Sequence, residues 1–113
     1  MPEAPSLRFI QSQVRSKRYR LTKHATIIRL ERGIGMDELE RALLEGEIIE
    51  RYPNDTPYPS CLVLGRRTSG DALHVVCSLG AVEPALRVVT VYEPEDTLWE
   101  SDYRTRKVKK TRP

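Results

Sequence analysis

The chain has 113 residues, of which 39% are hydrophobic and 31% charged, and its formal net charge is +3. These values are typical of one folded domain with a modest core and argue against disorder. No apolar run approaches the roughly 18–20 residues of a membrane span, and the first residues lack the pattern of a signal peptide, so we expect a cytoplasmic protein without a membrane partner.

The charge is unevenly distributed along the chain. Residues 1–32 carry a net charge of +6, residues 33–102 a net charge of −9, and residues 103–113 a net charge of +6. Positive charge at both ends suits a polyanion such as RNA, because each phosphate contact releases counterions. The alternative is a solvated surface with a basic tail, and charge alone does not decide between the two.

The N-terminal segment predicts a helix followed by a basic linker. Ser6 can cap this helix, and Leu7, Ile10 and Val14 then form one apolar stripe at helical spacing. We expect residues 1–18 to form a unit that precedes the main domain.

Two further helices are predicted after a short extended piece. Thr22 can cap a helix over residues 23–32. Asp37 and Glu40 have the spacing of a capping box for the next helix, whose acidic side chains we expect mostly outside.

From residue 47 onward the hydrophobic pattern has the period of strands. The predicted strands are residues 47–52, 61–67, 72–79 and 86–93, and a short helical turn is expected around residues 96–100. Helices followed by meandering strands predict an α+β fold, with N-terminal helices packed on one face of a four-stranded antiparallel sheet. We expect a single domain over residues 19–103 and a flexible basic tail over residues 104–113.

The two cysteines, Cys61 and Cys77, are in separate apolar segments and form no CxxC pair. Together with two distant histidines they make a poor zinc-binding set, so we expect reduced, buried thiols. The sequence has no glycine-rich phosphate loop and no carboxylate cluster with metal-ligand spacing. We therefore expect neither a metal nor another cofactor.

The predicted second helix carries three candidate catalytic residues. Arg29 and Arg32 share a helix face and can grip a phosphate, while His24 can act as a general acid or base because imidazole titrates near neutrality. The alternatives are a partly buried, hydrogen-bonded histidine and two arginines on a solvated or ion-paired helix face.

The last two predicted strands carry three more candidates. Alternation places His74 on the face opposite Leu73 and Val75, where it can serve an RNA site or bond across strands. Alternation also places Arg87 and Tyr92 on opposite faces of the last strand. Arg87 can stabilise the charge that develops on a phosphate, and Tyr92 can stack on a base. The alternatives are an edge-strand charge and an aromatic side chain at the rim of the core.

The C-terminal segment is rich in cations. These can hold RNA electrostatically or bind an acidic partner, and the alternative is a solubilising end. With Arg87, the predicted RNA-binding residues are Arg104, Arg106, Lys107, Lys109 and Lys110.

Several ordered motifs follow one another along the chain: Lys23-His24-Ala25, Arg29, Glu31-Arg32-Gly33-Ile34, Gly46-Glu47-Ile48-Ile49-Glu50, Tyr52-Pro53, Pro59-Ser60-Cys61-Leu62, Leu73-His74-Val75-Val76, Thr90-Val91-Tyr92, Pro94 and Trp99. Over about residues 20–107 they resemble the bacterial domain of unknown function 4258 family.

The resemblance implies a fold like that of the RelE, BrnT and MqsR toxins, metal-independent cleavage of messenger RNA by 2′-hydroxyl attack, and a small zinc-finger antitoxin as partner. No catalytic set of those toxins maps cleanly onto this chain. The positions that match the family motifs, and are therefore carried over as candidate catalytic residues, are His24, Arg29, Arg32, His74 and Tyr92. The alternative function is a non-enzymatic module that binds RNA or a protein.

Overall fold

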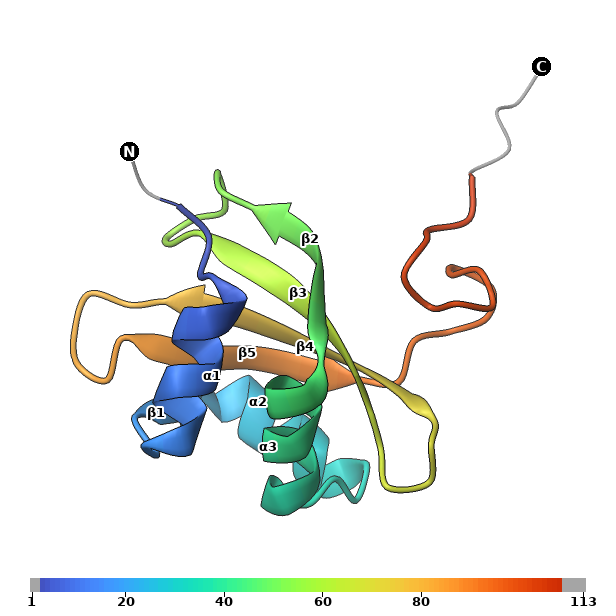
Figure 1. Ribbon diagram of the computed structural model, residues 1–113, viewed down its shortest axis with the longest axis horizontal. Helices are drawn as coiled ribbons and strands as arrows, with labels where there is room; N and C mark the ends of the chain where they lie inside the picture. The colour runs from blue at the N-terminus through green and yellow to red at the C-terminus, as the bar shows by residue number, and fades with distance from the viewer. Residues whose placement is uncertain (1–2, 109–113) are drawn as a thin grey trace.

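The computed structural model of the chain describes residues 3–108. Its elements, in chain order, are α1 (Leu7–Arg15), β1 (Tyr19–Leu21), α2 (Lys23–Glu31), α3 (Met36–Glu45), β2 (Glu47–Tyr52), β3 (Ser60–Arg66), β4 (Ala72–Leu79) and β5 (Leu86–Tyr92). The strands form one sheet, and the helices pack on one of its faces (Figure 1). We call the opposite face of the sheet the open face.

The predicted α+β class is confirmed, but the predicted sheet was wrong in two respects. The sheet has five strands in the order β1-β5-β4-β3-β2, and it is mixed, because β1 runs parallel to β5. The extra strand comprises only residues 19–21, which pair with residues 86–88. Three residues carry too little pattern to reveal a partner so distant in the chain.

The N-terminal helix belongs to the same core as the sheet. The Phe9 amide donates to the Ser6 hydroxyl at 3.1 Å, as the predicted cap requires. Ile10 and Val14 are buried in the cluster that also contains Leu43 of α3 and the inner residues of the sheet. Residues 7–15 are therefore an integral part of the domain rather than a preceding unit.

The other helix starts agree only in part with the prediction. Thr22 caps α2 by accepting from the Ala25 amide at 3.1 Å. The capping box predicted for α3 is absent, because Gly35 occupies the N-cap position and makes no side-chain cap. Glu40 instead accepts hydrogen bonds from Lys17 and Tyr19, and its side chain is 14% exposed, so it joins α3 to the segment around β1.

A β-bulge in β5 changes which side chains share a face. Val76 pairs with Thr90, but the next residue of β4 pairs with Val88, so Val89 is an extra residue on β5. Beyond the bulge, Val91 is buried in the core and Tyr92 lies opposite His74. Strict alternation was therefore wrong here, and Tyr92 lies on the same face of the sheet as Arg87.

After β5 the chain folds back over the open face in a segment that we call the strap (residues 94–108; orange to red in Figure 1). Residues 96–98 form a single turn, in which the Leu98 and Trp99 amides donate to the Glu95 carbonyl at 3.0 and 3.1 Å, the hydrogen-bond spacing of the short helical turn that was expected here. Trp99 is 3% exposed and forms a bridge with Arg106, while the Lys107 amide donates to the Leu98 carbonyl at 3.0 Å. Residues 104–107 are thus held by these contacts and are not the expected free tail.

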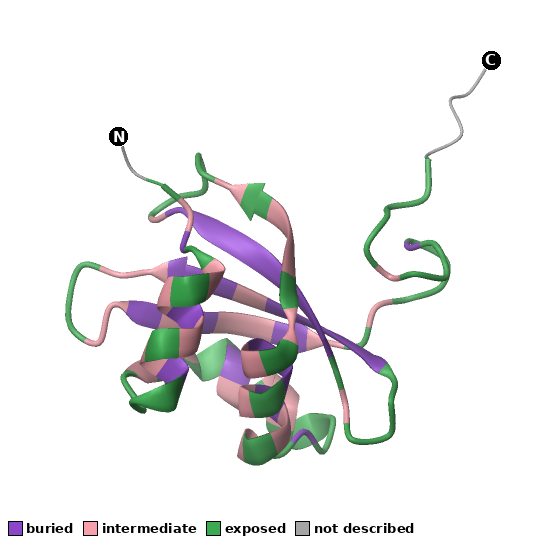
Figure 2. Cartoon of the chain, viewed as in Figure 1, coloured by how far each residue is buried: buried purple, intermediate pink, exposed green. Residues whose placement is uncertain are grey.

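The burial of each element agrees with a sheet that is covered by helices on one face and partly by the strap on the other. Strands β3 and β4 are mostly buried on both faces, whereas α2 and the strap expose many residues (Figure 2). Both Cys61 and Cys77 are free and buried, as predicted. Within residues 3–108, no helix has the length and apolar character needed to cross a membrane.

Candidate anion-binding site

The three candidate catalytic residues of α2 have different places: Arg29 and Arg32 lie at the end of the helix, and His24 lies at the edge of the sheet beside β5. His24 is exposed, and its Nε2 lies 3.0 Å from the Thr90 hydroxyl. Arg29 donates from Nη1 to the Ile34 carbonyl at 3.0 Å, so it secures the turn between α2 and α3. Arg32 is exposed at the end of α2. Arg29 thus has a structural contact, and His24 is at the edge of the sheet.

The other two candidates lie together on the open face, beneath the strap. His74 is fully buried, and its Nδ1 lies 3.3 Å from the Tyr92 hydroxyl. Its Nε2 is 2.7 Å from the Tyr103 carbonyl, which can only accept, so Nε2 carries the proton. The ring of Trp99 stands edge-on to the imidazole, with centroids 4.5 Å apart. Burial lowers the pKa of His74, so the ring is held neutral.

The structure brings His74 and Tyr92 together on the open face. His24 reaches this face at the edge of the sheet, because Thr90 is the register partner of Val76 and therefore lies on the face of His74. Arg29 and Arg32 lie at the end of α2, away from these groups, and a catalytic role for each of the five residues stays a prediction.

The predicted RNA-binding residues also have different environments. Arg104 forms an ion pair with Glu47, and Arg106 donates to both carboxylate oxygens of Glu50 at 2.8 and 3.0 Å. The Arg106 guanidinium also lies 4.5 Å from the centre of the Trp99 ring. Lys107 is exposed, and Lys109 and Lys110 are outside the described residues. The last of the predicted RNA-binding residues, Arg87, lies in a recess of the surface.

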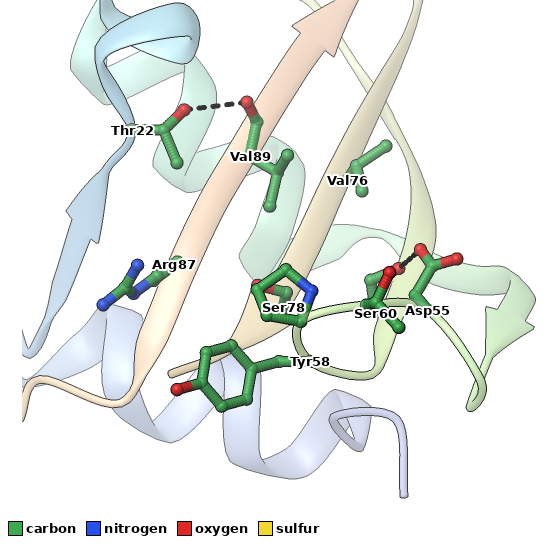
Figure 3. Close-up of a pocket in the computed structure, with 10 residues that line it drawn as sticks. Thr22, Asp55, Tyr58, Ser60, Val76, Ser78, Arg87 and Val89 are labelled. Atoms are coloured by element: carbon green, nitrogen blue, oxygen red, sulfur yellow. Dashed lines mark hydrogen bonds between the residues drawn. The ribbon is translucent and has the colours of Figure 1, made fainter. Parts of the chain in front are cut away.

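This recess is on the open face, next to the strap-covered part, and has a volume of about 220 Å³ (Figure 3). Its floor is formed by β4 and β5, and one wall by the loop between β2 and β3. The residues that line it are Thr22, Asp55, Thr56, Pro57, Tyr58, Ser60, Val76, Ser78, Arg87 and Val89.

Arg87 provides the positive charge of the recess. Its side chain extends from β5 toward β1 (Figure 3), and its Nε is buried without a hydrogen-bond partner among the described residues. Gly80 makes room for it, because a Cβ there would lie 2.5 Å from this Nε. A buried N–H without a partner costs free energy that an acceptor from a ligand would recover. The Nε of Arg29 is likewise buried without a partner within residues 3–108, but only Arg87 lines the recess, which makes the recess a candidate site for an anion.

Hydroxyl and carboxylate groups surround this cation. The Ser60 hydroxyl donates to Asp55 at 2.5 Å, and the Thr22 hydroxyl donates to the Val89 carbonyl at 2.9 Å. Tyr58 lies beside Ser78 at the edge of the recess (Figure 3). The recess therefore holds one fixed cation, several hydroxyl groups and one carboxylate, a set that can bind a phosphate and exchange protons with it.

Sequence reasoning identified Arg87 but missed the other residues of the recess. Ser78 was within reach, because alternation along the third predicted strand puts it on the face of His74. Asp55 and Tyr58 carried no usable signal, because the 53–59 loop predicts only a turn. Among residues 3–108, no three His, Cys, Asp or Glu side chains are grouped in a way that could hold a metal ion.

The fold and the recess define a small α+β domain with an arginine-containing recess on the open face of its sheet. A family model described as Domain of unknown function (DUF4258) matches residues 21–93, which is more than half of the chain. The chain therefore belongs to this family, and the matched span contains every residue that lines the recess. No curated protein and no solved structure matches the chain.

Proposed function

We propose that this protein binds RNA at the recess and cleaves it as a metal-independent endoribonuclease of the toxin class. The observation that carries the proposal is Arg87, a half-buried guanidinium with an unpartnered Nε among hydroxyl groups. A phosphodiester fits this environment, because it supplies the missing acceptor and gains negative charge in the transition state. The volume of about 220 Å³ is below the roughly 300–1,000 Å³ of most ligand pockets and suits a ribose–phosphate unit.

The residues of the recess can supply each proton transfer. The Asp55 carboxylate accepts the proton of the RNA 2′-hydroxyl while O2′ bonds to phosphorus. The bond from phosphorus to O5′ breaks, and O5′ takes a proton from the Tyr58 hydroxyl. The products are a 2′,3′-cyclic phosphate and a 5′-hydroxyl end, and Arg87 stabilises the charge on the phosphate oxygens between these states.

The relation to RelE-like toxins and the small zinc-finger antitoxin rest on the resemblance of the sequence motifs alone. The alternative function is RNA binding without cleavage. One observation favours it: the histidines, the usual acid–base groups near neutral pH, lie outside the recess, one at the sheet edge and one sealed beneath the strap.

The experiment incubates labelled single-stranded RNA with the protein in EDTA and identifies the product ends. We expect cleavage with a 2′,3′-cyclic phosphate, and we expect Arg87→Gln and Asp55→Asn each to slow it about 10²- to 10³-fold, as loss of a charged transition-state contact or a general base does.

The matched control is His24→Gln, which changes the exposed histidine on α2 and should leave cleavage unchanged. Cleavage that depends on His24 but not on Arg87 would place the site on α2 and overturn the proposal for the recess. Binding that needs Arg87 without any cleavage would establish the alternative function.

A further inference from the structure

A second arginine stands beside Arg87 on the open face. Strand β1 runs parallel to β5, and Arg20 is the register partner of Arg87. Tyr19 and Leu21, on either side of Arg20, pack against the core. Alternation therefore directs Arg20 to the open face, about 4.8 Å from Arg87 in backbone spacing.

These two cations form no ion pair within residues 3–108. One carboxylate, Asp55, lines the same recess as Arg87 and accepts from the neutral Ser60 hydroxyl, so a single negative charge faces two positive ones. Like charges at paired positions of a sheet destabilise it. A bound anion would reduce the repulsion between the two arginines. The pair therefore points to a ligand whose negative charges lie over both β1 and β5.

The two arginines lie at different depths. Arg87 is half-buried, with its guanidinium against Gly80, whereas Arg20 is exposed at the rim. A recess of about 220 Å³ has room for one phosphate and its ribose, but not for two nucleotides. The next phosphate of a bound strand must therefore lie outside the recess, over β1.

Given the proposed RNA-binding function, we infer that Arg87 and Arg20 bind two consecutive phosphates of one single strand, Arg87 the inner phosphate and Arg20 the outer one. Arg20 is then a positioning residue that draws the strand over β1 and sets the register of the linkage in the recess. The ligand class is single-stranded RNA with at least two consecutive phosphates.

The test uses 2′-O-methyl uridine oligonucleotides, which lack the attacking hydroxyl and cannot be cleaved. One probe is the dinucleotide with a single phosphate, and the other is the trinucleotide with two. Affinities are measured by NMR titration at low ionic strength, where contacts to phosphates are least screened. Arg20→Gln should weaken the trinucleotide about fivefold, the upper range for an exposed ion pair, and leave the dinucleotide unchanged. Arg87→Gln should weaken both at least about tenfold, as loss of charged hydrogen bonds does.

Two control variants accompany the test. Arg8→Gln removes an exposed arginine from α1, on the other side of the sheet, and reports the effect of net charge alone. Arg20→Lys keeps the charge and should retain most of the trinucleotide affinity. Thermal unfolding of each variant verifies that it is folded.

An equal loss for both probes in Arg20→Gln would mean that both arginines hold one phosphate, and an effect no larger than that of Arg8→Gln would mean that Arg20 binds none. Either result overturns the inference about Arg20. The proposed function still stands in that case if RNA binding and cleavage depend on Arg87. Failure of RNA cleavage with the predicted binding pattern intact would instead refute only the catalytic part of the proposed function.

Discussion

At the scale of single residues, His74 shows how burial redirects a reactive side chain. Its imidazole is sealed between β5 and the strap, where it donates to the Tyr103 carbonyl and packs edge-on against Trp99. Burial, partly opposed by that hydrogen bond, lowers the pKa of His74. A buried ring with these contacts joins the strap to the sheet.

The lowered pKa has a consequence for stability. The unfolded chain binds a proton at His74 near the ordinary pKa of about 6.5, before the folded protein does. The contribution of the neutral ring is therefore complete above about pH 6.5 and is lost as the pH falls below it. We expect urea unfolding to show a decline in stability from pH 7 to pH 5, and His74→Gln to reduce this decline.

The same variant should lose about 1–2 kcal/mol at pH 7, because it removes the ring packed on Trp99. His24→Gln is the matched control and should retain the decline. An unchanged pH dependence in His74→Gln would show that other groups cause it.

At the scale of elements, the strap is held by a few identifiable contacts. Arg106 bridges it to β2 through Glu50 and covers the Trp99 ring, whereas Arg104 makes a single, more exposed ion pair with Glu47. Exposed ion pairs contribute about 0–1 kcal/mol, and a cation over an aromatic ring adds about 0.5–1 kcal/mol. Arg106 should thus contribute more than Arg104.

Trp99 is the single tryptophan of the chain, so its fluorescence reports the state of the strap. We expect Arg106→Ala to shift the emission to longer wavelength, to increase quenching by acrylamide and to lower stability by about 1–2 kcal/mol. Arg104→Ala is the comparison and should change each quantity less. Equal effects of the two variants would contradict the role given to Arg106.

At the scale of the whole molecule, folding brings basic residues from the two ends of the chain next to acidic residues from its centre. Basic residues from both ends meet carboxylates of the central, acidic part of the chain: Lys17 with Glu40, Arg18 with Glu83, Arg104 with Glu47 and Arg106 with Glu50. Much of the basic character that suggested a polyanion is therefore used within the domain. Arg20 of β1 and Arg87 of β5 form no ion pair within residues 3–108, which is why we propose them as the phosphate-binding residues.

Carboxylates that join the layers make the fold sensitive to acid. Glu38 of α3 accepts two hydrogen bonds from Arg67, at 3.0 and 3.1 Å, which lower the pKa of its carboxyl group to about 2. Hydrogen bonds from Arg106 likewise lower the pKa of Glu50. Because these folded pKa values lie below the ordinary value near 4.5, the stabilisation is present above about pH 4.5 and is lost as the pH falls toward 2.

We expect Glu38→Gln to cost about 2 kcal/mol at pH 7, the range for a charged hydrogen-bonded pair, and the difference from the natural chain to shrink between pH 5 and pH 2. Chemical unfolding across this range measures it. Asp37→Gln, on an exposed residue of the same helix, serves as the control. A difference that stayed constant down to pH 2 would contradict the ionic origin of the effect.

Most of the helices and strands can be predicted from short-range patterns in the sequence. The caps at Ser6 and Thr22, the apolar stripe of α1 and the strands from residue 47 onward all follow from patterns within one element, because helix and strand periods are local properties. The α+β class and the buried cysteines also came from such patterns, and so did the choice of Arg87 as a candidate RNA-binding residue.

Which candidate side chains lie next to each other depends instead on long-range contacts of the folded chain. The pairing of β1 with β5, the bulge at Val89, the strap over His74 and the recess around Arg87 all depend on contacts between residues far apart in the chain. A single inserted residue reverses the face of every side chain beyond it, and a parallel strand of three residues has no signature of its own. For this reason the sequence directs attention to α2, whereas the structure places the candidate site on the open face of the sheet.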